Sequence, residues 1–218
     1  MKCKINFSLV LMLALPLFYA CDPYFGNKEC QEEQTINQTM TIYPYRDTFA
    51  LGDTIWIETK FELPANSPIL NDSIYLSIPF NFGIAYLSTN PWQYAFLSYF
   101  SFGSSLGSYI YRPLSSSEHG QDAGSLRLIY NKNGNSFSNK LFIVCKKSGI
   151  YQIAHINPST VKFFNNNLMC NQDLSILTKI DKDKNNFNYL LKHSVDTSYL
   201  KLDPASTYKD GAFYFFVK

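Results

Sequence analysis

The stretch DTFALGDTIWIETKFEL, residues 47–63, decides the fold class, because a tight turn is followed by regular alternation of apolar and polar residues. The Leu-Gly-Asp triplet at 51–53 predicts the turn. Across residues 54–58, Ile55 and Ile57 point to one face of an extended chain, whereas the residues between them point to the other. This pattern predicts a β-strand with one buried face.

Similar short apolar runs recur along the chain, with Gly, Asn, Pro and Ser between them. The aromatic content of 17% favours sheets, because Tyr, Phe and Trp suit a half-buried pleated surface. We expect Lys147, Ser148 and Gly149 to form a hairpin turn between two strands. The runs that predict further strands are residues 72–80, 125–131, 139–156 (two strands) and 211–218.

Together these runs predict a mainly β fold, an antiparallel sandwich with one or two short helices. Two stretches do not follow the strand pattern. Residues 90–100, NPWQYAFLSYF, begin with an Asn-Pro pair that suits a helix start, although their aromatics also suit a strand. Residues 185–199 place Phe187, Leu190 and Leu191 on one helical face.

The arrangement F-x-x-G-D-T-I-W-I, from Phe49 to Ile57, resembles the opening strands of immunoglobulin-like modules in bacterial surface proteins. The resemblance implies an immunoglobulin-like sandwich in which a Gly-Asp turn precedes a core strand. Such sandwiches usually contain about 100 residues. A domain predicted to span residues 41–218 would therefore carry insertions or a second subdomain.

The N-terminus has the three parts of a secretory signal peptide, predicted at residues 1–20. Lys2 and Lys4 form a basic region, an apolar run of 14 residues extends from Phe7, and the small residue Ala20 ends it. A membrane-spanning helix needs about 20 apolar residues. We therefore expect this run to be removed rather than kept as an anchor.

The tetrad Phe18, Tyr19, Ala20 and Cys21 resembles the lipobox of bacterial lipoproteins. The resemblance implies cleavage before Cys21 and acylation of its amine and thiol, and several acyl chains hold a protein on a bilayer. The alternative is an ordinary signal peptide cut near Ala20, with Cys21 in a disulfide. Residues 21–40 are polar and unpatterned, which predicts a tether.

The Asn-, Tyr- and Phe-rich composition resembles lipoproteins of Bacteroidota, in which acidic residues after the cysteine belong to a surface-export signal. Here Asp22 follows the cysteine directly. The resemblance implies a lipid-anchored protein of the outer membrane and leaves open whether the protein faces the periplasm or the cell exterior. Loss of Lys2 and Lys4 with the signal leaves 17 basic and 17 acidic residues, which argues against a nucleic-acid partner.

The cysteines predict one disulfide in an oxidising compartment. Besides Cys21, the cysteines after the signal are Cys30, Cys145 and Cys170. We expect Cys145 and Cys170 to pair, since Cys30 lies in the tether, and closing that loop would stabilise the fold by about 3 to 4 kcal/mol. A zinc site from these two cysteines and His155 is the alternative, although its spacing matches no common zinc motif.

Two motifs resemble functional sites, but the first is better explained as a flexible Gly/Ser loop and the second as a polar surface turn. GSSLG, residues 103–107, matches the G-x-S-x-G elbow with Ser105 as nucleophile, but no helix is predicted after it. Residues 181–192 begin like a calcium loop yet lack its Gly and its final Glu. His119 and His193 have no partner at a metal-ligand spacing. We expect no metal, no cofactor and no catalysis.

Aromatic residues between positions 92 and 111 are the most distinctive part of the composition. Aromatic rings have an apolar body, and Trp and Tyr add a polar tip, so exposed ones suit recognition surfaces. Trp92, Tyr94 and Tyr99 are the candidate ligand-binding residues. The sequence thus predicts a non-catalytic recognition or structural protein of the cell envelope, whose partner is a glycan or an envelope protein. A glycan-binding surface subunit is the first alternative, and a serine hydrolase using Ser105 is the second.

Overall fold

The structure is a computed structural model of the 218-residue chain. The residues that it describes are 33–71, 75–76, 78, 80–88, 93–94, 97–113, 124–155, 161–165, 170–180, 186–187, 192–193 and 211–218.

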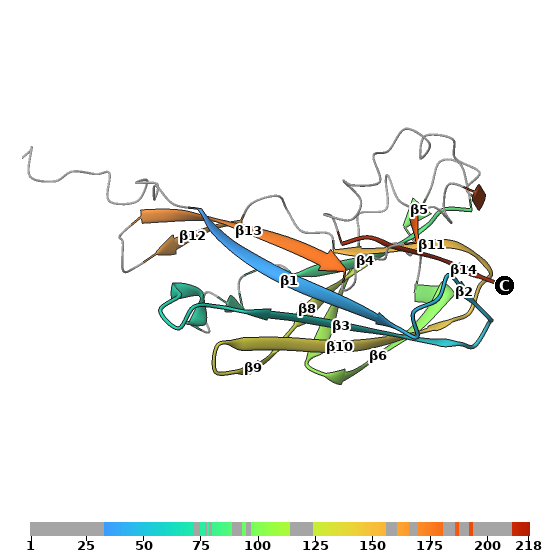
Figure 1. Cartoon of the computed structure of the whole chain (residues 1–218), viewed down its shortest axis with the longest axis horizontal. Coiled ribbons are helices and arrows are strands. Elements are labelled where there is room, and N and C mark those ends of the chain that lie inside the picture. The colour runs from blue at the N-terminus through green and yellow to red at the C-terminus, as the bar shows by residue number, and fades with distance from the viewer. Residues whose placement is uncertain are drawn as a thin grey trace, which may run out of the picture.

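Within these residues the strands form two seven-stranded sheets (Figure 1). The strand order of the first sheet is β12-β13-β1-β3-β10-β6, and β9 pairs with β10. Its strands are β1 (Gln34–Tyr43), β3 (Thr54–Glu62), β6 (Phe100–Leu106), β9 (Asn131–Asn133), β10 (Ser136–Cys145), β12 (Val161–Asn165) and β13 (Cys170–Ile180).

The second sheet has the order β2-β14-β11-β4-β8-β7, and β5 pairs with β4. Pairing is antiparallel except between β1 and β13 and between β14 and β2. Over the described residues the fold is mainly β with almost no helix, which confirms the predicted fold class. The strands of this sheet are β2 (Thr48–Phe49), β4 (Asn81–Tyr86), β5 (Gln93–Tyr94), β7 (Ser108–Pro113), β8 (Gly124–Ile129), β11 (Gly149–His155) and β14 (Phe213–Val217).

Strand β3 confirms the alternation on which the sequence argument rests. Ile55, Ile57 and Phe61 are buried on the inner face, and the residues directly before and after each of them lie on the outer face. The neighbouring strand β10 has the same pattern, and its Phe137 and Leu141 lie opposite Phe61 and Ile57. The two strands thus present a largely apolar inner face, interrupted by the buried polar pair Thr59 and Asn139.

That face packs on the second sheet through a cluster of aromatic rings. Phe61 stacks on Phe137 with ring centroids 4.7 Å apart and an interplanar angle of 5°. Phe80, from the segment before β4, lies 5.2 Å from Phe61, and Tyr130, after β8, lies 5.1 Å from it. Phe61 therefore contacts rings on both sides of the interface between the sheets.

A second aromatic cluster lies around Tyr151 of β11, a fully buried ring. Its centroid is 4.9 Å from that of Phe100 on β6 and 5.4 Å from that of Phe215 on β14. The Tyr151 hydroxyl donates a hydrogen bond to the carbonyl oxygen of Lys147 at 2.8 Å. Burial, above all, raises the pKa of this hydroxyl. Both aromatic clusters belong to the hydrophobic core.

A buried amide also joins the sheets. Asn139 of β10 donates from Nδ2 to the carbonyl oxygens of Ser108 and Ile129, both at 2.9 Å. The chain passes from β6 to β7 beside it at Gly107, which has a φ of +72°. A Cβ there would lie 2.5 Å from the Ile129 oxygen, so only glycine fits this crossing.

The predicted domain start near Thr41 is wrong, because β1 already begins at Gln34. Ile36 and Met40 are buried on the inner face. Between them lies Gln38, also buried, whose Nε2 donates to the Tyr130 hydroxyl. A polar residue inside the buried row interrupts the apolar alternation, and residues 34–40 therefore resemble a polar tether in the sequence.

The predicted strand over residues 72–80 is also wrong at its described positions. Tyr75 is helical, and its amide donates to the carbonyl oxygen of Asn71 at 2.9 Å. Leu76 is exposed, whereas Tyr75 and Ile78 are buried. The buried positions follow the spacing of a turn rather than that of a strand, after a short 3-10 helix at Pro68–Leu70 (η1).

The predicted hairpin at residues 147–149 is a crossing between the sheets, because β10 belongs to the first and β11 to the second. Gly149 has a φ of +147°, and a Cβ there would lie 2.3 Å from the ring of Tyr86. Sequence identifies the turn, but the same residues suit a hairpin and a change of sheet.

The helix considered for residues 90–100 is absent from its described part, where β5 and a 3-10 helix at Leu97–Tyr99 (η2) occur. In the second helical candidate, Phe187, Lys192 and His193 are helical. Phe187 is buried against Tyr214 of β14, with ring centroids 5.6 Å apart.

We predict that Phe61→Ala destabilises the fold by about 3 to 5 kcal/mol, because it removes a fully enclosed ring with aromatic neighbours on both sheets. The free energy of unfolding in urea is the measurement. Leu51→Ala is the control, since Leu51 is 54% exposed in a turn, and its effect should stay below about 1 kcal/mol. Equal losses for the two variants would contradict the central role of Phe61.

Candidate functional site

Several residues singled out in the sequence lie outside the described residues or are described only by their backbone. Cys21 and Trp92 lie outside the described residues, as do Cys30 and His119. Tyr94 lies in β5 next to β4, and its backbone alone is described.

Tyr99 is described in full and is engaged inside the fold. The Lys147 ammonium donates to the Tyr99 hydroxyl at 2.6 Å and lies 3.8 Å from the centroid of its ring. The same ammonium lies 4.7 Å from the centroid of Tyr86, and the two tyrosine rings are 5.2 Å apart in an edge contact. Tyr99 therefore helps to fasten the β10–β11 crossing to its neighbours.

The predicted disulfide between Cys145 and Cys170 is wrong, because Cys145 is a free, buried thiol. Cys170 begins β13 and Cys145 ends β10, with β1 and β3 between these strands. Three strand spacings are about 14 Å, and a disulfide needs Cα atoms within about 7 Å. The registers also place the start of β13 near the start of β10, at the end of the sheet opposite Cys145. The same separation excludes the zinc alternative.

The surroundings of Cys145 keep its thiol protonated. Burial, with the carboxylate of Asp53 acting in the same direction and the guanidinium of Arg46 in the opposite one, raises the pKa of Cys145 to about 12. Arg46 and Asp53 pair with each other at 2.6 Å. A thiol with this pKa is not nucleophilic near neutral pH, so Cys145 acts as a packing residue.

Ser105 lies within β6 and is exposed. Strand β7 follows after Gly107, so the segment is a strand-to-strand crossing. A nucleophile elbow needs a strand-to-helix turn. The expectation of a flexible loop is wrong as well, because Gly103 to Leu106 are strand residues.

Among the residues described, no cluster of three or more His, Cys, Asp or Glu side chains could hold a metal ion. Of the calcium-like stretch, residues 181–185 lie outside the described residues. Asn186 has a φ of +58°, its Oδ1 accepts from the Tyr45 hydroxyl at 2.6 Å, and its Nδ2 donates to the Arg46 carbonyl at 3.4 Å. These bonds give Asn186 a structural role.

The outer face of the first sheet carries a different set of aromatic residues. Tyr43 on β1, Trp56 on β3 and Phe142 on β10 lie side by side in the strand register, and all three are half-buried. The rings of Tyr43 and Trp56 are nearly parallel, at 8°, with centroids 6.2 Å apart. The centroids of Trp56 and Phe142 are 5.2 Å apart. We call these three residues the aromatic row.

The row continues over the edge strand β6, where Phe142 lies opposite Gly103. A Cβ at Gly103 would lie 2.1 Å from the Cζ atom of Phe142, so the ring of Phe142 rests directly on the glycine backbone. Position 103 needs glycine because of this close approach and not because of its backbone dihedral angles. This contact allows the Phe142 ring to lie along the surface of the sheet.

Charged side chains border the row. The Lys140 ammonium lies 5.1 Å from the centroid of Tyr43 and 5.2 Å from that of Trp56, a cation–π arrangement. A hydrogen bond with the Tyr43 hydroxyl, chiefly, raises the pKa of Lys140. Glu58, opposite Lys140 in the register, pairs with Lys60 at 2.8 Å. The row thus has an aromatic surface with hydrogen-bonding groups at its margin.

This combination suits a ligand that has both apolar C–H surfaces and hydroxyl groups, because aromatic rings pack on the former and polar groups bind the latter. The aromatic row is not apparent from the sequence alone. Its members are 13 and 86 positions apart, Tyr43 to Trp56 and Trp56 to Phe142. Each does lie on the polar side of an alternating strand, which is the signal that marks it in the sequence.

A scan against known protein families finds no match to the chain, and a search of curated proteins finds none either. In the part of the chain that the structure describes, no helix is long and apolar enough to cross a membrane.

We predict that Gly103→Ala displaces the Phe142 ring and destabilises the fold by about 1 to 3 kcal/mol, the usual effect of overpacking. Trp56 fluorescence, measured in a Trp92→Phe background, should shift because Trp56 contacts Phe142. Adding Phe142→Ala should remove most of the effect of Gly103→Ala, since the clashing ring is gone. Ser105→Ala on the same strand is the control, and a loss as large as that of Gly103→Ala would contradict the contact.

Proposed function

We propose that the chain is a lipid-anchored protein of the bacterial cell envelope and that its β-sandwich is a non-catalytic recognition module that binds glycans at the aromatic row. The observation that carries the proposal is the placement of Tyr43, Trp56 and Phe142 on the outer face of the first sheet. The lipid anchor rests on the N-terminal sequence, with Cys21 as the acylated residue.

The position of the row separates it from the core. On β1, β3 and β10 the inner positions form the hydrophobic core, and the outer positions are mostly Thr, Asn, Ser, Lys and Glu. Three aromatic residues meet at one place on this polar face. The sheet would form equally well with polar residues at these three outer positions. Rings on the outer face also contribute nothing to the packing between the two sheets.

The dimensions of the row favour an extended ligand. Steps of 6.2 and 5.2 Å separate the ring centroids, in a line that crosses three adjacent strands. The strands hold the rings at a fixed spacing, so little side-chain freedom is lost on binding. A glycan of two or more sugars can contact all three rings, whereas one sugar contacts part of the row.

The charged border supplies the polar half of such recognition. Lys140 and Glu58 provide a donor and an acceptor beside the rings, and sugar hydroxyls bind both kinds of group. An envelope protein is the second candidate partner, because Trp and Tyr are also enriched in the centres of protein interfaces. Binding experiments with purified polysaccharides distinguish the two.

We predict that the detergent-solubilised full chain binds at least one bacterial or host polysaccharide on an array, and that Trp56→Ala weakens this binding about tenfold or more, the scale of a lost aromatic anchor. Affinity is measured by titration of the polysaccharide. Trp92→Phe is the matched control, because Trp92 is the tryptophan outside the row, and it should retain binding. Unchanged binding in Trp56→Ala, or loss only in Trp92→Phe, would overturn the site.

The anchor has its own test. We predict that cells expressing the chain incorporate radiolabelled palmitate into it and that Cys21→Ser abolishes this incorporation, because the serine lacks the thiol to be acylated. Cys30→Ser is the control, since Cys30 lies further along the same N-terminal segment and should leave labelling unchanged. Palmitate incorporation into the Cys21→Ser protein would refute the lipoprotein assignment without touching the glycan proposal.

A further inference from the structure

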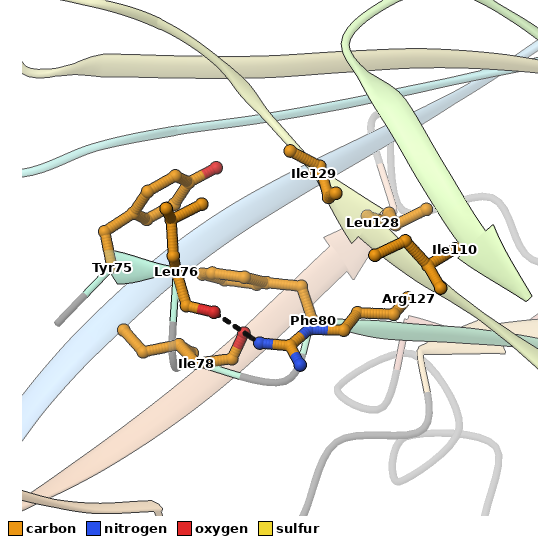
Figure 2. Close-up of a pocket in the computed structure, with 8 residues that line it drawn as sticks. All are labelled: Tyr75, Leu76, Ile78, Phe80, Ile110, Arg127, Leu128 and Ile129. Carbon is orange, nitrogen blue, oxygen red and sulfur yellow. Dashed lines mark hydrogen bonds between the residues drawn. The ribbon is translucent and has the colours of Figure 1, made fainter. Parts of the chain in front are cut away.

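The second sheet has a pocket of about 230 Å³ on its side away from the first sheet. The pocket lies between the segment before β4 and the strand pair β7 and β8 (Figure 2). Its wall is mostly apolar and includes one cation, the guanidinium of Arg127. The lining residues are Tyr75, Leu76, Ile78, Phe80, Ile110, Arg127, Leu128 and Ile129.

Two of the apolar residues at this pocket are unusually open to solvent. Leu76 is 56% exposed and Ile110 is 44% exposed. Ile110 lies on the edge strand β7, directly opposite Arg127 on β8, so these residues share one face of the sheet. Phe80 and Leu128 are buried. The pocket thus has a firm inner wall and an apolar rim that a ligand would cover.

Arg127 is held in place by the chain that forms the rim. Its Nη2 atom donates to the carbonyl oxygen of Leu76 and, at 3.4 Å, to that of Ile78. Figure 2 shows the guanidinium beside these carbonyl groups, with another of its nitrogen atoms directed away from them. Two carbonyl groups fix the position of the cation but do not neutralise its charge.

Among the residues that the structure describes, no carboxylate lies within ion-pair distance of Arg127. A half-buried guanidinium beside apolar side chains has lost part of its hydration. Arginine is also the side chain best suited to bind a carboxylate through paired N–H groups. A carboxylate ligand is therefore the complement to the charge of this pocket.

We propose that this pocket binds a compact amphipathic monocarboxylate, with the carboxylate on Arg127 and a branched or aromatic apolar body against Leu76, Ile78 and Ile110. The volume of about 230 Å³ lies below the range of about 300 to 1,000 Å³ that is typical of drug-sized ligands. The ligand is therefore small, either a free acid or the terminal carboxylate of a peptide that ends in an apolar residue. This site is independent of glycan binding at the row.

The test is a calorimetric or NMR titration of the full chain with 4-methylpentanoate and with acetylated Ala-Leu, each compared with its uncharged amide. For a ligand of this size a Kd of about 1 mM is expected. Each acid that binds should do so about tenfold more tightly than its amide, the scale of a lost charged hydrogen bond. Binding of the dipeptide alone would assign the site to a peptide terminus, and binding of 4-methylpentanoate to a free acid.

Variants separate the pocket from unspecific binding. Arg127→Gln should weaken acid binding about tenfold, to the level of the amide, whereas Arg112→Gln, an exposed arginine on β7, should leave it unchanged. Because Arg127 also holds two carbonyl groups, Ile110→Glu provides a variant that keeps this clamp and still repels the acid; it should abolish binding. Equal binding of acid and amide, no saturable binding of either acid, or equal effects of Arg127→Gln and Arg112→Gln would overturn the proposal.

Discussion

The stacking of Phe61 on Phe137, together with the contacts of Phe61 with Phe80 and Tyr130 beside the second sheet, is the interaction on which the rest of the structure depends. Phe61 and Phe137 lie opposite each other on β3 and β10, which are neighbours in the first sheet. Phe80 and Tyr130 close over them from the other side. Once these rings meet, the distance between the sheets is set, and Asn139 can reach the crossing from β6 to β7.

The packing of these rings also decides which aromatic residues remain for binding. Because side chains alternate along a strand, burying Phe61 directs Trp56 outward on β3, and burying Leu141 directs Phe142 outward on β10. The aromatic row is thus a consequence of the same register that builds the core. On the second sheet, the pairing of β7 with β8 places Ile110 beside Arg127 in a comparable way. The aromatic row depends on backbone pairing alone, whereas the pocket also takes Leu76 and Ile78 from the segment before β4.

The parts of the fold that sequence predicts well are those in which apolar residues fill most of the inward positions. Strand β3 and the C-terminal strand β14 belong to this group. Prediction failed where a local pattern had two solutions. Strand β1 is hard to recognise because Gln38, whose buried amide is bonded to Tyr130, looks in the sequence like a solvent-exposed residue. The turn before Gly149 suits a hairpin, yet it leads into the other sheet.

The amino-acid sequence determines the local order along the chain: extended strands, turns at Gly and a side chain on the buried face at every second residue. It does so because side-chain alternation and the conformational freedom of glycine depend only on near neighbours in the chain. The order of strands, the free state of Cys145 and the meeting of Tyr43, Trp56 and Phe142 follow only from the folded protein. These features join residues far apart in the chain. Their physical cause is the packing of two whole sheets, which no local pattern contains.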